Sequence, residues 1–275
     1  MRDNNFDEKT CWITGASSGI GAALAQALNQ QGAITIISAR NKKKLDELKR
    51  KCLFPDKIIV LSCDMEKINS LPDITKQAWQ FSDGIDYAFL NAGISVRDFF
   101  INIEFEYIKK VMNVNFFSAA IITKTLLPLM IKRGSGHFVI TSSLSGKYGI
   151  PKLSAYAASK HALHGLFESL HAEYEKDKIG ISMVIPGLIR THISENALLG
   201  DGSVSGKMQE SIAAGISPEK CAIGILKGVI KNKNYIVVGG PEKFTIFINR
   251  LSPELMAFII RSHPLKKLRK WGFVN

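Results

Sequence analysis

Short runs that are mainly apolar, without polar residues at regular intervals, alternate along the chain with longer segments in which apolar residues recur at helical spacing. A run that is apolar throughout is typical of a strand buried on both faces, as in a parallel sheet covered by helices. Such runs predict strands at residues 9–14, 34–38, 58–62, 86–90, 136–141, 180–185 and 235–238.

The longer segments predict helices between these strands. Residues 18–31 repeat apolar side chains at a helical interval and stop at Gly32. Similar patterns predict helices at residues 41–51, 104–131, 154–176 and 218–231. Strands and helices that alternate along almost the whole chain predict an α/β fold with a doubly wound, Rossmann-like parallel sheet in a single domain.

The alternation breaks near residue 190. Residues 190–215 are rich in glycine and serine and follow the carboxyl end of a predicted strand, which is the edge where such sheets bind ligands. We predict a lid over the substrate here, with a plain surface loop as the alternative. Residues 1–240 are therefore predicted to form the dinucleotide-binding and catalytic domain, and residues 241–275 a helical, amphipathic and basic extension.

Composition narrows the class of protein. The 275 residues are 46% hydrophobic and 22% charged, which is ordinary for a globular protein, and their net charge is +12. The basic residues are mostly scattered, which favours phosphorylated cofactors, acidic substrates or an anionic bilayer over nucleic acid as partners. Four cysteines without CxxC spacing indicate buried free thiols in a reducing compartment, and no metal site is expected. The chain lacks a hydrophobic signal region and a run of about 20 apolar residues, so a cytoplasmic location is expected.

A glycine-rich turn joins the first predicted strand to the first predicted helix. Glycines at this junction let the backbone approach a pyrophosphate, and the helix start presents free N–H groups and the positive end of its dipole. The alternative is a tight turn whose glycines serve only packing. The candidate cofactor-binding residues here are Gly15, Ser17, Ser18, Gly19, Ile20 and Gly21.

Two residues at strand ends address the choice of cofactor. An acidic residue after the second strand would bind the ribose 2′-hydroxyl of NAD, whereas the guanidinium of Arg40 suits a 2′-phosphate. Arg40 therefore predicts NADP(H) rather than NAD(H), unless it is only an exposed cation at a helix start. Asp64, at the end of the third strand, is a candidate for the adenine amino group or for a helix cap.

Tyr156 and Lys160 carry the most specific chemical signal. At positions i and i+4 they project from one face of a helix, and Ser143 lies thirteen residues before the tyrosine. The tyrosine can then donate or accept a proton, while the ammonium favours its ionised form.

Together these motifs resemble the short-chain dehydrogenase/reductase family over residues 9 to about 240. They occur in the family's order: TGxxxGxG at 14–21, Asn-Ala-Gly at 91–93, Asn115, Ser143, Tyr156 with Lys160, and the segment 186–191. The lid and the C-terminal region are similar to the dehydrogenase/reductase member 7B-type branch. That branch includes membrane-associated reductases linked to acyl- or alkyl-dihydroxyacetone phosphate.

The resemblance implies a role for each matching residue. Tyr156 would be the general acid in ketone reduction, Ser143 would polarise the carbonyl, Lys160 would bind the nicotinamide ribose and lower the pKa of the tyrosine, and Asn115 would seat a water. Further residues would line the cofactor cleft: Asn91, Ala92, Gly93, Pro186, Gly187, Ile189 and Thr191. A homodimer or homotetramer is also implied.

These observations predict an NADP(H)-dependent oxidoreductase that interconverts a ketone and a secondary alcohol on a hydrophobic, lipid or steroid-like substrate. The alternative is a protein of the same fold that binds or senses NADP(H) without turnover. The tail is apolar between residues 244 and 260, with Pro253 inside it, and then basic, with Lys266, Lys267, Arg269, Lys270 and Trp271. It suits the interface of a bilayer, or equally a helix that closes the pocket or packs on another subunit.

Overall fold

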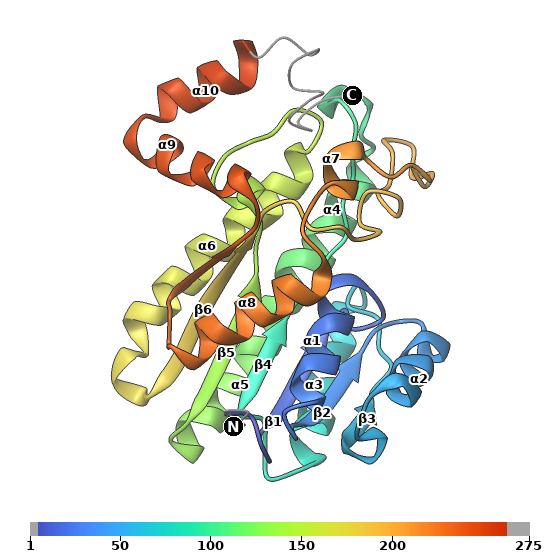
Figure 1. Ribbon diagram of the computed structural model, residues 1–275, viewed down its shortest axis with the longest axis vertical. Helices are drawn as coiled ribbons and strands as arrows, with labels where there is room; N and C mark the ends of the chain where they lie inside the picture. The colour runs from blue at the N-terminus through green and yellow to red at the C-terminus, as the bar shows by residue number, and fades with distance from the viewer. Residues whose placement is uncertain (1–4, 263–275) are drawn as a thin grey trace.

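A seven-stranded parallel sheet forms the centre of the protein (Figure 1). The computed structural model describes residues 5–262. The strand order is β3-β2-β1-β4-β5-β6-β7, with every neighbouring pair parallel, so the doubly wound prediction is confirmed. The strands are β1 (Thr10–Thr14), β2 (Ile34–Ser38), β3 (Ile58–Val60), β4 (Tyr87–Leu90), β5 (Gly136–Thr141), β6 (Ile179–Pro186) and β7 (Tyr235–Val238).

Helices cover both faces of this sheet. The main ones are α1 (Gly19–Asn29), α2 (Lys42–Lys51), α3 (Leu71–Gln80), α4 (Phe105–Met112), α5 (Ser118–Arg133), α6 (Ser154–Glu173) and α8 (Pro218–Ile230). Buried side chains of α1, α2 and α8 pack on one face together with Ile13. Those of α3, α5 and α6 pack on the other together with Trp12. Because adjacent strand residues point to opposite faces, both must be apolar, which explains the uninterrupted apolar runs.

The segment between β4 and β5 differs from its prediction. In place of one uniform helix, a π-helical turn, Asn113–Phe117, joins α4 to α5. By length and composition, the combined helix Phe105–Arg133 could cross a membrane. No segment apolar enough to do so was expected from the sequence. Half of its most apolar window is buried inside the fold, and Ile122 and Leu126 belong to the core beneath the sheet. It thus has the character of a core helix.

Helix α3 was not predicted. It begins with Leu71 and Pro72 and buries only three of its ten residues, Leu71, Thr75 and Ala78. A helix this short with so narrow an apolar stripe gives a weak periodic signal.

Several segments gather beyond the carboxyl ends of the strands. The predicted lid contains a short helix, α7 (Glu210–Ala213), and is bound to the loop after β4. The Arg97 N–H donates to the Leu198 carbonyl at 2.8 Å, and the Leu198 N–H donates to the Ser95 carbonyl at 2.9 Å. Helices α9 (Thr245–Leu251) and α10 (Pro253–Ser262) stand at the same end (Figure 1). The basic residues after 262 and Trp271 lie outside the described residues.

Candidate active site

The three motif glycines are required by close contacts at the turn between β1 and α1. Gly15 and Gly19 have φ angles of +69° and +55°, which favour glycine. A Cβ on Gly21 would lie 2.3 Å from the Gly15 carbonyl oxygen. A Cβ on Gly15 would lie 2.8 Å from the Cα of Ala92, and one on Gly19 3.0 Å from a methyl group of Thr191. The turn therefore touches both of the other segments predicted to line the cofactor cleft.

The amino terminus of α1 is open to a ligand. Ser18 occupies the cap position in extended conformation, but no side chain caps the helix. Ser17 and Ile20 are partly buried beside it, and the Ala16 N–H donates to the Ser38 carbonyl at the end of β2. Uncapped N–H groups at a helix start, with no Cβ atoms in the way, fit a pyrophosphate.

Asn91 holds the ends of three strands together. Its amide Nδ2 donates to the Thr14 carbonyl at 3.1 Å, and its Oδ1 accepts from the Thr141 hydroxyl at 3.3 Å. The Thr14 hydroxyl in turn accepts from the N–H groups of Asn91 and Ala92. Asn91 thus ties these strand ends together, and Thr14, the first residue of the TGxxxGxG motif, belongs to the same network although it was not among the candidate cofactor-binding residues.

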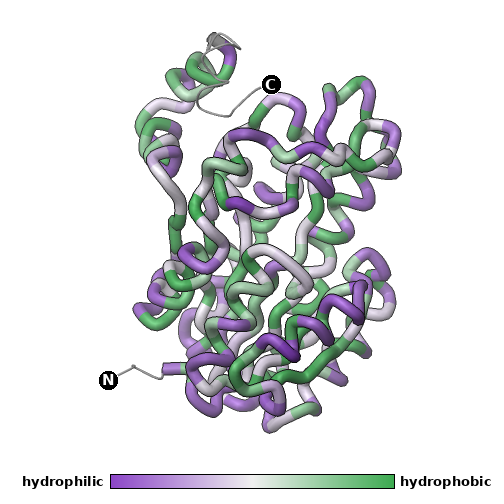
Figure 2. Tube along the Cα trace, turned by 45° about the vertical axis from the view of Figure 1, so that its right-hand side comes forward, coloured by the Kyte–Doolittle hydropathy of each residue, from purple (hydrophilic) through white to green (hydrophobic). Residues whose placement is uncertain are grey.

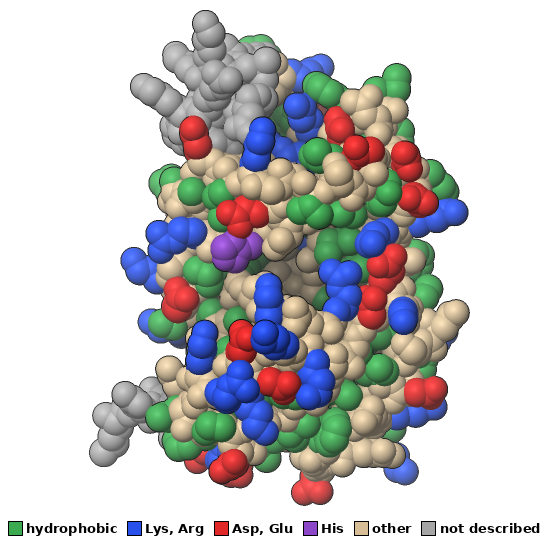
Figure 3. Space-filling view, turned by 90° about the vertical axis from the view of Figure 1, so that its right-hand side faces the viewer, with side chains coloured by type: hydrophobic (Ala, Val, Ile, Leu, Met, Phe, Trp, Pro, Cys, Tyr) green, Lys and Arg blue, Asp and Glu red, His purple; other side chains and the backbone are tan. Residues whose placement is uncertain are grey.

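Arg40 is exposed just after β2. It lies two residues after Ser38, whose carbonyl accepts from the Ala16 N–H of the glycine turn. Lys42, Lys43 and Lys44 follow it, also exposed. Figure 3 shows lysine and arginine side chains gathered along one side of a hollow in this face of the molecule. Asp64 makes a local turn instead of a helix cap, since its Oδ1 accepts from the Glu66 N–H at 3.0 Å.

The segment after β6 is held by a buried carboxylate. Glu242 is 8% exposed, and its Oε1 accepts from the N–H groups of Leu188 and Gly240, both at 2.8 Å. A Cβ on Gly187 would lie 2.1 Å from the same oxygen. Of the predicted cleft residues in this segment, Thr191 lies beside Gly19 of the glycine turn, whereas Pro186 pairs with Val238 of β7 and Ile189 is buried and bridges to Ile216. No sequence motif pointed to Glu242, because it acts from a position more than fifty residues away.

Tyr156, Lys160 and Ser143 come together beyond β5. The tyrosine and the lysine share one face of α6, with Lys160 Nζ 5.7 Å from the centroid of the Tyr156 ring. Burial raises the pKa of Tyr156 above its ordinary value, and a hydrogen bond with the Ser143 side chain opposes that rise. Ser143 is thus a group that favours the ionised form of Tyr156, and the expected effect of Lys160 on this pKa stays a prediction.

Lys160 is a buried cation. It is 2% exposed, and its Nζ donates to the Thr141 carbonyl at 2.8 Å. Within residues 5–262 no salt bridge includes it. Burial lowers its pKa to about 8. Gly93 leaves room beside it, since a Cβ there would lie 3.5 Å from Nζ. An ammonium with spare donors beside a glycine fits the hydroxyl groups of a nicotinamide ribose.

Asn115 lies on the π-helical turn between α4 and α5. Its Oδ1 accepts from the Ile94 N–H at 2.8 Å, while its Nδ2 donates to the Ile94 carbonyl at 3.0 Å and to the Ser159 hydroxyl at 2.9 Å. π-Helical turns occur frequently at functional sites. Here the turn joins the loop after β4 to the helix that carries Tyr156, and it places Asn115 behind Lys160 and Gly93.

Ser142, the neighbour of Ser143, belongs to a different network. Its hydroxyl is 2.9 Å from His164 Nε2, and His164 Nδ1 is 3.2 Å from the Glu168 carboxylate. Burial is the main cause that lowers the pKa of His164, to about 4, so the ring is neutral near pH 7. Since a carboxylate only accepts, Nδ1 donates to Glu168 and Nε2 accepts from Ser142. Ser142 is thus occupied inside the fold, which leaves Ser143 to face the cleft.

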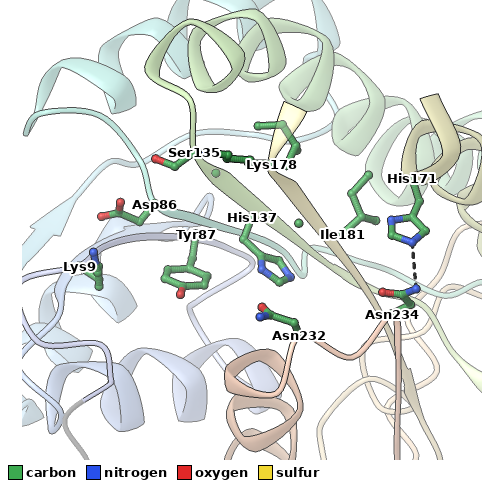
Figure 4. A pocket seen from close by; sticks show the side chains of 13 residues that line it. Lys9, Asp86, Tyr87, Ser135, His137, His171, Lys178, Ile181, Asn232 and Asn234 are labelled. Carbon is green, nitrogen blue, oxygen red and sulfur yellow. Dashed lines mark hydrogen bonds between the residues drawn. The ribbon is translucent and has the colours of Figure 1, made fainter. Parts of the chain in front are cut away.

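A separate pocket of about 450 Å³ lies at the opposite edge of the sheet (Figure 4). Tyr87, Gly136 and Ile179, which begin β4, β5 and β6, line it. Ligands of doubly wound sheets bind at the carboxyl ends of the strands, so this hollow is not the candidate active site. Among the described residues, no cluster of three or more metal-ligating side chains is present there or elsewhere.

Comparison with known proteins agrees with this geometry. A sequence model of the short chain dehydrogenase family matches residues 9–200. "Dehydrogenase/reductase SDR family protein 7-like" of Drosophila melanogaster is 38% identical, over 96% of this chain and 82% of that protein. "Dehydrogenase/reductase SDR family member 7B" of Bos taurus is 34% identical, over 93% of this chain and 81% of that protein.

Two solved structures share the fold. A short-chain dehydrogenase/reductase from Burkholderia phymatum in complex with NAD has a TM-score of 0.80 at 21% identity, covering 91% of this chain and 95% of that chain. A short-chain dehydrogenase from Sphingobium yanoikuyae in complex with NADPH has a TM-score of 0.75 at 22% identity, covering 92% and 96%. The chain therefore belongs to the short-chain dehydrogenase/reductase family of oxidoreductases, in the branch of members 7 and 7B, and has that family's nicotinamide dinucleotide-binding fold.

Proposed function

We propose that the protein is an NADP(H)-dependent reductase that interconverts a ketone and a secondary alcohol on a hydrophobic substrate with an anionic group. The observation that carries this proposal is the grouping of Tyr156, Ser143 and the buried cation of Lys160: Lys160 Nζ lies 5.7 Å from the Tyr156 ring centroid, and the Ser143 side chain opposes the rise in the pKa of the tyrosine. This trio lies at the carboxyl edge of the sheet, where the uncapped start of α1 opens.

The two hydroxyl groups act together on the substrate carbonyl. Both donate to its oxygen, which polarises the carbon for attack. The bound nicotinamide cofactor supplies the hydride and takes up the electron pair on reversal. As negative charge develops on the substrate oxygen, Tyr156 transfers its phenolic proton there and becomes tyrosinate. Lys160, protonated near neutral pH, stabilises that anion electrostatically until a proton is regained.

The preference for NADP(H) rests on Arg40. Its exposed guanidinium stands at the end of β2, where the adenosine ribose lies in this fold class, and no acidic residue occupies positions 38–41. A planar guanidinium binds a 2′-phosphate through two parallel hydrogen bonds. The three lysines that follow add positive potential.

The loop after Ser143 supports a hydrophobic substrate. Leu144 and Tyr148 form an apolar cluster with Met256 of α10, and Ile150 and Ile246 pack against it. The Tyr148 hydroxyl also bonds the Thr245 hydroxyl at 2.6 Å, at the start of α9. Helices α9 and α10 therefore pack on the loop that follows Ser143. An apolar wall of this kind beside the reacting hydroxyl groups would suit a substrate with a long alkyl chain or a ring system.

Arg97 supports an anionic group on that substrate. It follows the cleft residue Gly93 by four positions, and its backbone N–H donates to the carbonyl of the lid residue Leu198. Its side chain is partly buried, and burial lowers its pKa. Within the described chain it has neither an ion pair nor a side-chain hydrogen bond. Arginine is rarely buried without an anionic partner, so a substrate phosphate or carboxylate is the partner we assign to it.

Oxidation of NADPH with a panel of ketones tests this function. The panel holds a long-chain acyl-dihydroxyacetone phosphate, a ketosteroid and small neutral ketones. We expect turnover with at least one hydrophobic ketone and a fall of about 10²–10⁴-fold in Tyr156→Phe. Arg97→Met should raise KM about tenfold for the phosphorylated ketone alone. Equal background rates in wild type and Tyr156→Phe would instead indicate a non-catalytic NADP(H)-binding protein.

A further inference from the structure

The loop between β4 and α4 exposes large apolar side chains at one end of the molecule. Phe99, Phe100 and Ile101 are 58, 66 and 91% exposed, and Phe105, at the start of α4, is 66% exposed. Apolar residues are often exposed singly, but four within seven positions form a contiguous patch. The loop is not loose, since Phe99 and Asn102 bond to Asp98, and the Glu104 N–H donates to Gly200.

The C-terminal helices expose a second apolar set. Phe247 and Leu251 of α9 and Phe258 of α10 are 63, 86 and 59% exposed, while Met256 on the opposite side is buried. Phe244 and Leu255 extend this surface. Figure 2 shows apolar stretches both in these helices and in the loops at the same end of the molecule. Helix α9 packs the half-buried Ile246 and Ile248 against the fold and α10 buries Met256, while the described residues leave the other apolar side of each helix uncovered.

The loop that follows Ser143 joins the two sets into one surface. At one end, the Lys152 carbonyl accepts from the Asp98 N–H at 3.1 Å. At the other end, the Lys147 carbonyl accepts from Asn249 Nδ2 at 3.0 Å. We name the surface made of the exposed side chains of residues 99–105, 149–152 and 244–258 the apical face. The loop that follows Ser143, at residues 144–152, thus lies in the middle of this face; we call it the substrate loop.

Lysines stand beside the exposed aromatic rings of the apical face. Lys152 lies 4.8 Å from the ring centroid of Phe99, Lys109 lies 4.9 Å from that of Phe105, and Lys243 lies 5.7 Å from that of Phe244. Arg250 and Arg261 add positive charge, whereas Glu104, Glu106 and Glu254 oppose it. Apolar rings that insert among acyl chains, with cations level with the headgroups, are the pattern of proteins that lie on anionic bilayers.

We propose that the apical face docks on the surface of an anionic lipid bilayer, with the loop at residues 99–101 and helices α9 and α10 inserted among the headgroups. The lysines beside Phe99, Phe105 and Phe244 favour an anionic lipid surface over a second copy of this chain, because a like-charged, +12 partner would repel them. The face surrounds the substrate loop, so docking presents that loop to the membrane. This last consequence rests on the proposed function, whereas docking itself does not.

Vesicle binding tests the docking. The full-length protein is sedimented with vesicles of phosphatidylcholine mixed with phosphatidylglycerol, and with vesicles of phosphatidylcholine alone. We expect stronger binding to the anionic vesicles, and a loss of about tenfold or more in the double variant Phe100→Asp/Ile101→Asp. Leu53→Asp is the matched control, since Leu53 is 58% exposed but lies after α2, away from the apical face. It should bind as wild type does.

Three results would overturn the proposal. These are absent binding of wild type to anionic vesicles, unchanged binding of the double variant, and a halved molecular mass in solution for that variant, which would make the face a contact between copies. A variant truncated after residue 262 tests whether residues 263–275, rather than a bilayer, cover the apical face. If it binds vesicles more tightly than the full chain does, residues 263–275 cover the face and the proposal fails. Turnover of a small water-soluble ketone is measured in parallel, and it should stay within about twofold in the double variant, so failure of docking and failure of catalysis are distinguishable.

Discussion

Lys160 illustrates, at the scale of single residues, how function is built at the expense of stability. An ammonium that is 2% exposed and has one protein acceptor is unfavourable in the folded protein without cofactor. The lowered pKa of Lys160, about 8 in the folded protein against about 10.5 in the unfolded chain, reflects the same cost of burying the charge. The cation is retained because the proposed tyrosinate and ribose need it.

Lys160→Met should therefore stabilise the protein without cofactor while abolishing turnover. At pH 7 we expect the free energy of unfolding to rise by about 1–2 kcal/mol, the relief of ion burial exceeding the lost bond to Thr141. Urea unfolding measures it, with the exposed lysine variant Lys220→Met as control. A destabilised Lys160→Met would show that the ammonium is already compensated.

The same group predicts a pH dependence. Between pH 8 and about 10 the unfolded chain binds a proton at Lys160 that the folded chain has released, so stability should rise with pH in this window. The rise is about 2–3 kcal/mol at most, and Lys160→Met should lack it. Above pH 10 the raised pKa of Tyr156 acts in the opposite direction, because the folded state keeps that proton longer. A flat profile in wild type would contradict the burial argument.

Arg40 gives the residue-level test of the cofactor. Arg40→Ala should raise KM for NADPH about tenfold and leave KM for NADH nearly unchanged, because only the former carries a 2′-phosphate. Steady-state kinetics with both cofactors decides this, with Lys220→Ala as a distant charge control. Equal effects on both cofactors would remove the argument for NADP(H).

At the scale of elements, buried histidines connect the helices to the sheet. His164 joins α6 to the end of β5 through Ser142, and His137 of β5 bonds Ser182 of β6 at 2.9 Å. Burial is the main cause that lowers both pKa values to about 4. Protonation of either ring would therefore place a charge in the packed interior, so the protein should lose stability in acid.

Between pH 6.5 and pH 4 the unfolded chain binds protons at these histidines that the folded chain does not, so stability falls as pH falls through this window. From pH 7 to pH 5 each should account for about 2 kcal/mol. His164→Gln should remove its share of this loss, and the exposed His161→Gln should not. Urea titrations at both pH values measure the difference, and an unchanged loss in His164→Gln would exclude His164 as a cause.

Each element of the fold was predictable to the extent that its burial leaves a periodic pattern of apolar residues. The inner strands, such as β1, β4 and β5, were predictable because burial on both faces favours apolar residues at successive positions, and the edge strand β7 was recognisable because its four residues are apolar although Tyr235 and Val237 are exposed. Helix α6 was predicted to begin at Ser154, where it does begin. Helix α3 and the π-helical turn at Asn113–Phe117 were not predictable, because a narrow apolar stripe and one extra residue per turn leave no periodic signal.

At the scale of the whole molecule, the C-terminal extension and the cofactor cleft are one mechanical unit. Glu242 lies just beyond the predicted domain boundary, yet it accepts from the N–H of Leu188, in the segment that leads to Thr191 beside the glycine turn. A contact of this kind cannot be predicted from the sequence, because no fixed spacing relates Glu242 to residue 188. The glycine turn, Ser143 and the Tyr156–Lys160 pair were identifiable because their spacing is local or fixed by one helix.

Glu242→Ala tests this coupling. Loss of both acceptor bonds to Leu188 and Gly240 should weaken NADPH binding about tenfold and lower stability by about 2 kcal/mol. Glu242→Gln keeps an acceptor oxygen and should restore most of the affinity. Fluorescence titration of NADPH measures both, with the exposed Glu254→Ala as control. Equal affinity in Glu242→Ala and wild type would separate the extension from the cleft.

The central claim is that Tyr156 delivers a proton to a ketone oxygen while a bound nicotinamide reduces the adjacent carbon. Mass spectrometry of the product after incubation with NADPH deuterated at its transferable hydrogen tests it most directly. The account predicts an alcohol that carries one deuterium in wild type, and about 10²–10⁴-fold less of it with Tyr156→Phe although NADPH still binds. An unlabelled product, or equal labelled product from both proteins, would contradict it.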